Sequence, residues 1–257
     1  MTLKIDVTLD YALFGPTDCL AQIYAAETPH QKILSGVLTT QSGMPRSTPA
    51  EEGIGERLWV RESNRINWRY TAEVDIDRTV EDIAGLSSDM PHDMPPEVVK
   101  YLFPSRYCPS DKFMAFVNTE FGRLQGGAKL VAMNDFVKNN FSYVPGTSDA
   151  ETSALETFVL RQGVCRDFAH MLITLARAGT IPARIVSVYA LGVDPQDFHA
   201  VVEVWLQGAW HLVDPTGMAE PENMAGICVG RDATDIAFLT TYGPAELRAQ
   251  SVNVTRG

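Results

Sequence analysis

Three short segments of the chain carry side chains that could act together as a nucleophile, a base and an orienting group. Cys165 stands immediately before an apolar run with helical period. His199 begins one stretch rich in Val and Trp, and Asp214 ends the next, both typical of strands. In thiol-dependent acyl transfer an imidazole takes the thiol proton and a carboxylate holds the imidazole. These residues therefore predict a cysteine-dependent acyl-transfer enzyme.

Cys165 differs from the other three cysteines in its position at the expected start of a helix. The free backbone N–H groups of a first turn and the positive end of the helix dipole both favour a thiolate there. Most isolated cysteines are buried structural residues, and this interpretation suits Cys19, Cys108 and Cys228. Cys165 alone is therefore the candidate nucleophile.

The pairing of two expected strands, 198–207 and 209–214, decides whether His199 and Asp214 can meet. If the Gln-Gly pair between them forms a two-residue turn, His199 shares a face of the sheet with Asp214. The two are then diagonal neighbours, about 7–8 Å apart at the backbone. A loop of odd length would put them on opposite faces. The same register puts His211 on the other face and excludes it as the base.

Each candidate also has an ordinary structural interpretation, and two further residues are weaker candidates. His199 could be a simple strand histidine and Asp214 a simple turn residue, but their matching parity and the helix-start thiol favour the functional interpretation. Tyr143 ends a short strand-like segment and could border a substrate cleft. His170 lies five residues after Cys165, about 140° round the helix, and could line a pocket edge. For both, a packing role is as well supported as substrate binding.

Composition narrows the classes of partner and location. Hydrophobic residues make up 45% and charged residues 21% of the 257 positions, an ordinary globular balance. A net charge of −11 without a Lys/Arg cluster argues against a nucleic-acid partner. No apolar run approaches the roughly 20 residues of a membrane helix, so no membrane partner is expected. Without a signal-peptide pattern or CxxC spacing, a cytoplasmic protein with reduced thiols is expected.

The elements that must position these residues divide the chain into three parts. Residues 1–80 alternate like strands and predict an N-terminal antiparallel β domain, either a sandwich or a barrel, with a hairpin at 58–71 and a mobile loop at 41–55. Residues 81–109 form a proline-punctuated connector. Residues 110–257 show helical periodicity and then strands. They predict a catalytic domain with helices packed on an antiparallel sheet, an α+β fold.

Several short motifs resemble those of the transglutaminase-like superfamily, whose bacterial branch is often described as cysteine proteases. The matching segments are Gly-Val-Cys-Arg-Asp-Phe-Ala at 163–169, Gly-Thr-Ile-Pro-Ala-Arg at 179–184 with Thr180 as one additional residue, His-Ala-Val-Val-Glu-Val-Trp at 199–205, Asp-Pro-Thr at 214–216 and Val-Gly-Arg-Asp at 229–232. Together they cover about residues 125–245, and the N-terminal β region resembles the accessory domain of these bacterial proteins.

The resemblance implies a papain-like core, in which the helix carrying Cys165 packs on an antiparallel sheet that bears His199 and Asp214. Cys165 would then be the nucleophile, His199 the base and later the acid, and Asp214 the orienting carboxylate. The backbone N–H of Cys165 would hold the oxyanion together with a second donor that the sequence does not identify. Attack on a carbonyl would give a thioester.

Chemistry up to the thioester is shared by two classes of enzyme. Water resolves it in a cysteine peptidase or amidase, and an amine resolves it in a transglutaminase. Hydrolysis of a peptide, isopeptide or other amide bond is favoured, because water is always present whereas an amine needs its own pocket. A non-catalytic peptide-binding module is the third alternative. We expect a peptide or protein amide substrate, no cofactor and no metal, since the three side chains are better explained as a triad than as zinc ligands. The oligomeric state is not predicted.

Overall fold

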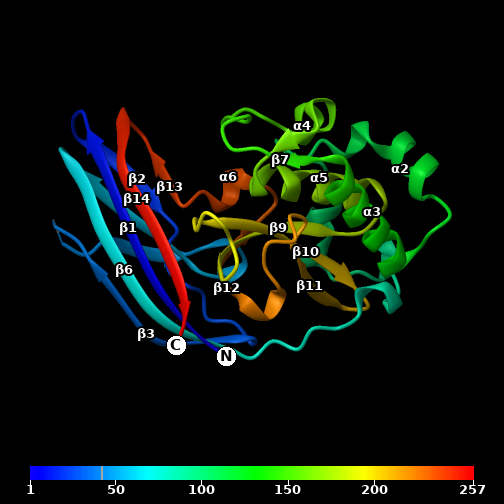
Figure 1. Ribbon diagram of the computed structural model, residues 1–257, viewed down its shortest axis with the longest axis horizontal. Coiled ribbons are helices and arrows are strands. Elements are labelled where there is room, and N and C mark those ends of the chain that lie inside the picture. Colours follow the sequence, from blue (N-terminus) through cyan, green and yellow to red (C-terminus); the bar gives the residue numbers. More distant parts are fainter. Residues whose placement is uncertain (42) are drawn as a thin grey trace.

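The computed structural model describes residues 1–41 and 43–257. Two layered parts lie end to end (Figure 1). A strand-rich part, built from the first and last segments of the chain, occupies one end, and helices packed on a central sheet occupy the other. This arrangement confirms the expected α+β fold with an N-terminal β region.

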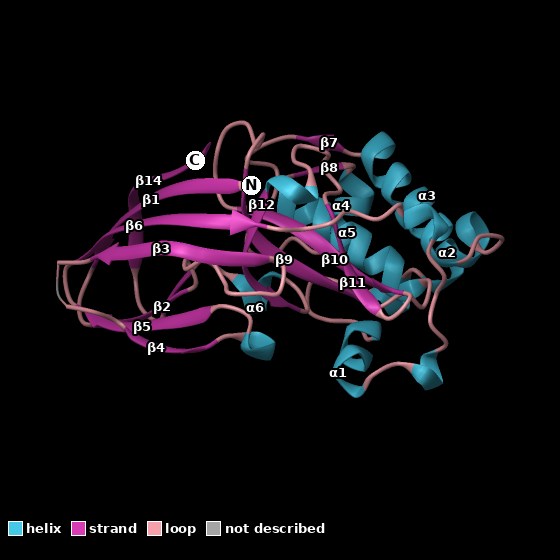
Figure 2. Ribbon diagram, turned by 90° about the horizontal axis from the view of Figure 1, so that it is seen from below, coloured by secondary structure: helices cyan, strands magenta, loops and turns pink. Residues whose placement is uncertain are grey.

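The strand-rich part is a sandwich of two four-stranded sheets, which Figure 2 shows one above the other. The first sheet has the order β14 (Ala245–Arg256), β1 (Thr2–Leu13), β6 (Arg65–Ile76), β3 (Gln31–Thr39). The second has the order β13 (Leu239–Thr241), β2 (Thr17–Ala21), β5 (Glu56–Glu62), β4 (Arg46–Pro49). Alternate residues of β1, including Leu3, Ile5 and Val7, are buried between the sheets, as period-two alternation requires.

The hairpin expected at 58–71 was wrong. Strands β5 and β6 belong to different sheets, so the turn between them carries the chain across the sandwich. Both edges of each strand are already occupied, because β5 pairs with β2 and β4 while β6 pairs with β1 and β3. Two consecutive strands with alternating apolar residues therefore do not pair with each other when the backbone of each is hydrogen-bonded to other strands on both sides.

The segment 41–55 was expected to be a mobile loop, and the described part of it is structured. It contains β4 and a 3-10 turn at Glu51–Gly53, while Ser42 lies outside the described residues. Glu51 and Glu52 both pair with Lys100, and Glu52 also pairs with Arg184. Ion pairs to the second part of the molecule thus hold a segment whose composition alone is typical of loops.

The expected catalytic unit 110–257 differs from the structure at its C-terminal end. Strands β13 and β14 belong to the sandwich, and β14 pairs along β1. The reason is apolar packing, because Val252 and Val254 of β14 are buried in the same core as Ile5 and Val7. The boundaries expected near residues 80 and 110 stay a prediction.

The second part of the molecule is a helical layer on an antiparallel sheet. The sheet has the order β11 (Ala209–Val213), β10 (His199–Leu206), β9 (Ala183–Ala190), β12 (Met224–Gly230). The helices are α1 (Pro96–Val99), α2 (Met114–Phe121), α3 (Gly126–Asn140), α4 (Ala154–Leu160), α5 (Cys165–Ala178) and α6 (Ala233–Ile236), and a small parallel pair joins β7 (Ser142–Tyr143) to β8 (Gln162–Gly163). Helix α5 packs against β9 and β10 through fully buried side chains such as Met171 and Leu172, which fixes where its first residue lies. Among the described residues, none of the helices is long and apolar enough to cross a membrane.

Candidate active site

Cys165 is the first residue of α5, and its turn is held by a buried cap. The Asp167 carboxylate, fully buried, accepts a hydrogen bond of 2.8 Å from the Val164 N–H and pairs with Arg166 at 3.0 Å. The Asp167 Cβ would lie 2.6 Å from a Cβ added at Gly163, so only glycine allows this approach. The Gly-Val-Cys-Arg-Asp motif therefore builds a rigid helix start under the thiol.

Exposure separates Cys165 from the other thiols. Cys165 is partly exposed, whereas Cys19, Cys108 and Cys228 are buried. Burial raises the pKa of the Cys19 thiol to about 11 and the pKa values of the Cys108 and Cys228 thiols to about 12. These three thiols are protonated at neutral pH and face the core, as expected for structural cysteines.

The register expected for β10 and β11 is confirmed. Leu206 lies opposite Ala209 and Val202 lies opposite Val213, with a two-residue turn between the strands. The turn residues Gln207 and Gly208 have φ angles of 51° and 78°, the left-handed pair that a tight hairpin requires. His199, at the start of β10, and Asp214, just after β11, consequently share a face.

His199 and Asp214 form a buried hydrogen-bonded pair. The His199 Nε2 and Asp214 Oδ2 atoms are 3.0 Å apart, and the two side chains are 0% and 2% exposed. Asp214 also accepts hydrogen bonds from the Thr216 amide and hydroxyl and from the Met218 and Ala219 amides. Burial opposes the ionised carboxylate, but the His199 and Thr216 hydrogen bonds outweigh it and lower the pKa of Asp214. Asp214 is therefore a fully hydrogen-bonded anion.

The electrostatics of His199 favour its protonated form. Burial lowers the pKa of the imidazole, but the Asp214 hydrogen bond and the neighbouring Cys165 thiol outweigh burial and raise the pKa of His199 to about 9. Because Asp214 only accepts, Nε2 must carry the proton that it shares with Asp214. The other ring nitrogen, Nδ1, has no hydrogen-bond partner among the described residues.

Tyr143, a candidate for the cleft border, lies beside Cys165. Burial and the Cys165 thiol raise the pKa of the Tyr143 hydroxyl to about 12, while a hydrogen bond from the Cys165 backbone N–H opposes this rise. The influence of the thiol shows that the tyrosine hydroxyl lies near Cys165. Strand β7, which carries Tyr143, is held there by pairing with β8, directly before α5.

The expectation that His170 lines a substrate pocket was wrong. His170 is fully buried, and burial lowers the pKa of its imidazole to about 4. Its ring stacks on Tyr107 with centroids 5.1 Å apart, and its Nε2 accepts a hydrogen bond from the Ala233 N–H at 3.1 Å. A neutral, fully buried histidine does not touch a substrate; it holds Tyr107 and Ala233, which do line a cavity.

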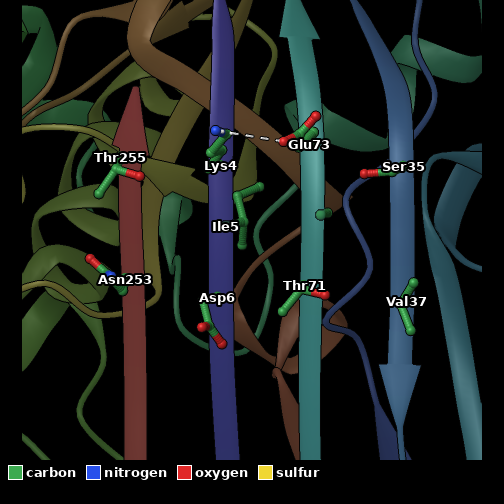
Figure 3. A pocket seen from close by; sticks show the side chains of 10 residues that line it. Lys4, Ile5, Asp6, Ser35, Val37, Thr71, Glu73, Asn253 and Thr255 are labelled. Carbon is green, nitrogen blue, oxygen red and sulfur yellow. Dashed lines mark ion pairs between the residues drawn. The ribbon is translucent and has the colours of Figure 1, made fainter. Parts of the chain in front are cut away.

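A cavity of about 340 Å³ opens beside the Cys165 thiol. Its lining includes Cys165 and His199 together with residues of α6 and the segment that follows it. A second hollow, on the outer face of the first sandwich sheet and shown in Figure 3, contains none of the candidate residues. Most of the side chains there are polar and Lys4 pairs with Glu73 at 3.8 Å, so that hollow is an ordinary solvated sheet face. In the described parts of the chain, 1–41 and 43–257, no group of three or more His, Cys, Asp and Glu side chains could hold a metal ion.

Comparison with known proteins places the chain in a family. The family described as the transglutaminase-like superfamily matches residues 115–215. The solved structure of a "putative cysteine protease" from Cytophaga hutchinsonii is 33% identical, and the match covers 100% of this chain and 90% of that one with a TM-score of 0.93. The chain belongs to the transglutaminase-like superfamily.

Membership of the transglutaminase-like superfamily, together with this relative, supports a cysteine-dependent enzyme. A second relative, an uncharacterized protein of Mycobacterium leprae (strain TN), is 32% identical over 148 residues, or 54% of this chain. The match covers 53% of that relative, so this chain spans about half its length.

Sequence reasoning missed the residues that surround the triad candidates. The cavity wall of Ile236 and Phe238 lies outside any motif, because it acquires its place only through the sandwich. Likewise, nothing in the sequence marked the Met218 and Ala219 amides as partners of Asp214, since backbone donors leave no trace in residue type. Only the Thr of Asp-Pro-Thr carried a signal, and its hydroxyl does bind Asp214.

Proposed function

We propose that this protein hydrolyses peptide, isopeptide or other amide bonds through a thioester on Cys165, with His199 as base and acid and Asp214 as the orienting carboxylate. The observation that carries the proposal is the state of the His199 ring. Its Nε2 is hydrogen-bonded to the buried carboxylate of Asp214, and its Nδ1 has no hydrogen-bond partner among the described residues. The Cys165 thiol raises the pKa of the same ring.

The first half-reaction transfers the acyl group to sulfur. Nδ1 of His199 holds the proton that the Cys165 thiol gives up, and the thiolate attacks the substrate carbonyl carbon to form a C–S bond. The C–N bond then breaks, and the leaving nitrogen takes the proton from His199. A pKa of about 9 for His199 suits this step, because the imidazolium survives at neutral pH beside the thiolate.

The second half-reaction returns the free enzyme. His199 takes a proton from water, the hydroxide attacks the thioester carbon, and the C–S bond breaks to leave a carboxylic acid. The proton on His199 returns to the Cys165 sulfur. Asp214 keeps its negative charge throughout, held by its other donors, and stabilises the imidazolium each time it forms.

The Cys165 backbone N–H and the Tyr143 hydroxyl are the donors proposed for the tetrahedral oxyanion. As the first residue of α5, Cys165 has an N–H without an acceptor inside the helix. Because the Tyr143 hydroxyl interacts with Cys165, it is the second donor proposed beside that N–H. A donor of this kind contributes a few kcal/mol of transition-state stabilisation.

The deciding measurement is the rate of iodoacetamide alkylation of each cysteine at pH 7, read by mass spectrometry. We expect Cys165 to react at least about tenfold faster than Cys19, Cys108 and Cys228, because it alone is partly exposed and coupled to a base. His199→Ala should slow Cys165 by a similar factor. His211→Ala, in the same sheet but bound to the Leu206 carbonyl, is the matched control and should change nothing. An alkylation rate of Cys165 that is unchanged in His199→Ala would contradict the proposal.

Hydrolysis and transamidation are separated by the product. Peptide amides incubated with the protein and a fluorescent primary amine should yield free acid, with the amine left unincorporated. Transfer of the fluorescent amine to the peptide would instead identify a transglutaminase, which uses the same steps as far as the thioester.

A further inference from the structure

The cavity beside Cys165 is lined mainly by apolar side chains. More than half of its lining is hydrophobic, and most of these side chains come from two separate segments, around Phe198 and from Ala233 to Leu239. Because Cys165 and His199 form part of the same lining, a group that fills this cavity lies next to the reacting carbonyl. The volume of about 340 Å³ falls in the range of small-molecule pockets.

Two stacked aromatic rings form one wall of this cavity. Phe198 and Phe238 stack with centroids 4.5 Å apart and planes only 3° from parallel. Phe198 also packs on Tyr189, which is fully buried, so the wall rests on the core of the molecule. A stacked, half-buried pair presents a rigid apolar surface and loses little side-chain freedom when a ligand covers it.

The charged groups at the rim are already engaged. The Arg166 guanidinium donates to the Asp149 carbonyl at 2.6 Å and pairs with the buried Asp167. The Asp197 carboxylate accepts from Gln250 at 2.7 Å and from the Phe198 N–H at 2.8 Å. The cavity therefore offers no free cation to an acidic side chain, and the Asp197 charge disfavours one.

The sandwich holds the aromatic wall in place. Gln22, a buried residue directly after β2, donates from its side chain to the Asp235 and Ala237 carbonyls at 3.0 and 3.3 Å. Its backbone N–H donates to the Phe238 carbonyl at 3.0 Å, and β13 continues from there as an edge strand of the second sheet. The N-terminal region thus holds one wall of the cavity in place.

We propose that this cavity is the specificity pocket for the acyl donor and accepts a large apolar side chain, aromatic or branched aliphatic, adjacent to the carbonyl that Cys165 attacks. Phe238 is the specificity-determining residue, and hydrogen bonds from the β-sandwich hold it in place. The proposal rests on the proposed function, because it takes Cys165 as the nucleophile.

The test measures inactivation by N-acetyl amino acid chloromethyl ketones that carry Phe, Leu, Ala, Asp or Lys side chains. In this reaction the Cys165 thiolate forms a C–S bond and chloride leaves, so no turnover is needed. We expect the Phe and Leu reagents to react at least about tenfold faster than the Ala reagent, with Asp slowest. Phe238→Ala should reduce the Phe-over-Ala preference about tenfold, whereas Phe14→Ala, an exposed phenylalanine of the sandwich, should leave it intact.

Iodoacetamide, which has no side chain to recognise, separates the two proposals. An unchanged iodoacetamide rate at Cys165 in Phe238→Ala shows an intact thiol, so a lost preference then reports on the pocket alone. Should Phe238→Ala fail to fold, Phe238→Trp tests the same pocket by making it smaller. The Ala reagent should then react faster relative to the Phe reagent than it does with the unchanged protein. Equal rates for all side chains, or a Lys reagent that reacts fastest through Asp197, would overturn the pocket while the nucleophile stands. An inert Cys165 towards iodoacetamide would overturn both.

Discussion

At the scale of single residues, two buried histidines experience opposite electrostatics within one domain. The hydrogen bond from His199 to the Asp214 carboxylate and the nearby Cys165 thiol outweigh the effect of burial, so the pKa of His199 rises to about 9. For His170, burial prevails over its neighbours and lowers the pKa to about 4. The sequence presents both as histidines near apolar residues, and only the hydrogen-bond partner separates a candidate base from a packing residue.

The raised pKa of His199 predicts a loss of stability at alkaline pH. A group whose pKa is higher in the folded state stabilises the fold fully below its unfolded pKa, near 6.5, and this contribution is lost as pH rises towards about 9. We expect the free energy of unfolding to fall by on the order of 2 kcal/mol between pH 6.5 and 9, relative to His199→Gln. Urea unfolding at the two pH values measures it, with His211→Gln as control. A difference that is the same at both pH values would show that His199 is not charged in the fold.

At the scale of elements, the sequence predicted best what depends on local periodicity. The α5 start at Cys165 and the β10–β11 register follow from a helical apolar run and from a Gln-Gly turn that accepts left-handed backbone. Both placed candidate residues correctly relative to their own elements. The hairpin expected at 58–71 failed because strand partners are chosen by the whole sandwich, and alternation in one strand does not name its neighbour.

The close contact beneath α5 predicts that Gly163→Ala destabilises the helix start. The added Cβ would meet Asp167 Cβ at 2.6 Å and force the cap away from the Val164 N–H. We expect a loss of about 1–3 kcal/mol in the free energy of unfolding and slower alkylation of Cys165. Gly85→Ala is the matched control, because nothing lies within 4 Å of its added Cβ. Equal thermal and chemical stability of the two variants would contradict the account of this motif.

At the scale of the whole molecule, the sandwich and the sheet that carries His199 are joined through the loop that leads to this residue. The Gln196 carboxamide mimics a strand neighbour: its Oε1 accepts from the Val254 N–H at 2.8 Å and its Nε2 donates to the Val254 carbonyl at 2.9 Å. Asp197 adds the bond to Gln250 on the same strand, β14. The sequence could not show this, because the residues that meet lie more than fifty positions apart and belong to no motif.

Loss of the two hydrogen bonds between Gln196 and Val254 should destabilise both β14 and the loop before His199. We expect Gln196→Ala to speed hydrogen exchange of the Val254 amide at least about tenfold and to weaken the fold by roughly 1–2 kcal/mol, because two hydrogen bonds are lost. Asn253→Ala, on the outer face of the same strand, is the control and should leave the Val254 amide protected. Protection that survives in Gln196→Ala would mean that β14 is held by β1 alone.

The pairing of β1 with β14 also sets the order in which parts of the molecule can form during synthesis. A chain emerging from the ribosome carries Cys165, His199 and Asp214 before it carries Phe238 or β14. Until β14 has been synthesised, β1 has only one neighbour in its sheet. Until Phe238 has been synthesised, the aromatic wall of the cavity has only the Phe198 ring. The residues proposed as nucleophile and base are therefore synthesised before the residues that complete the proposed pocket.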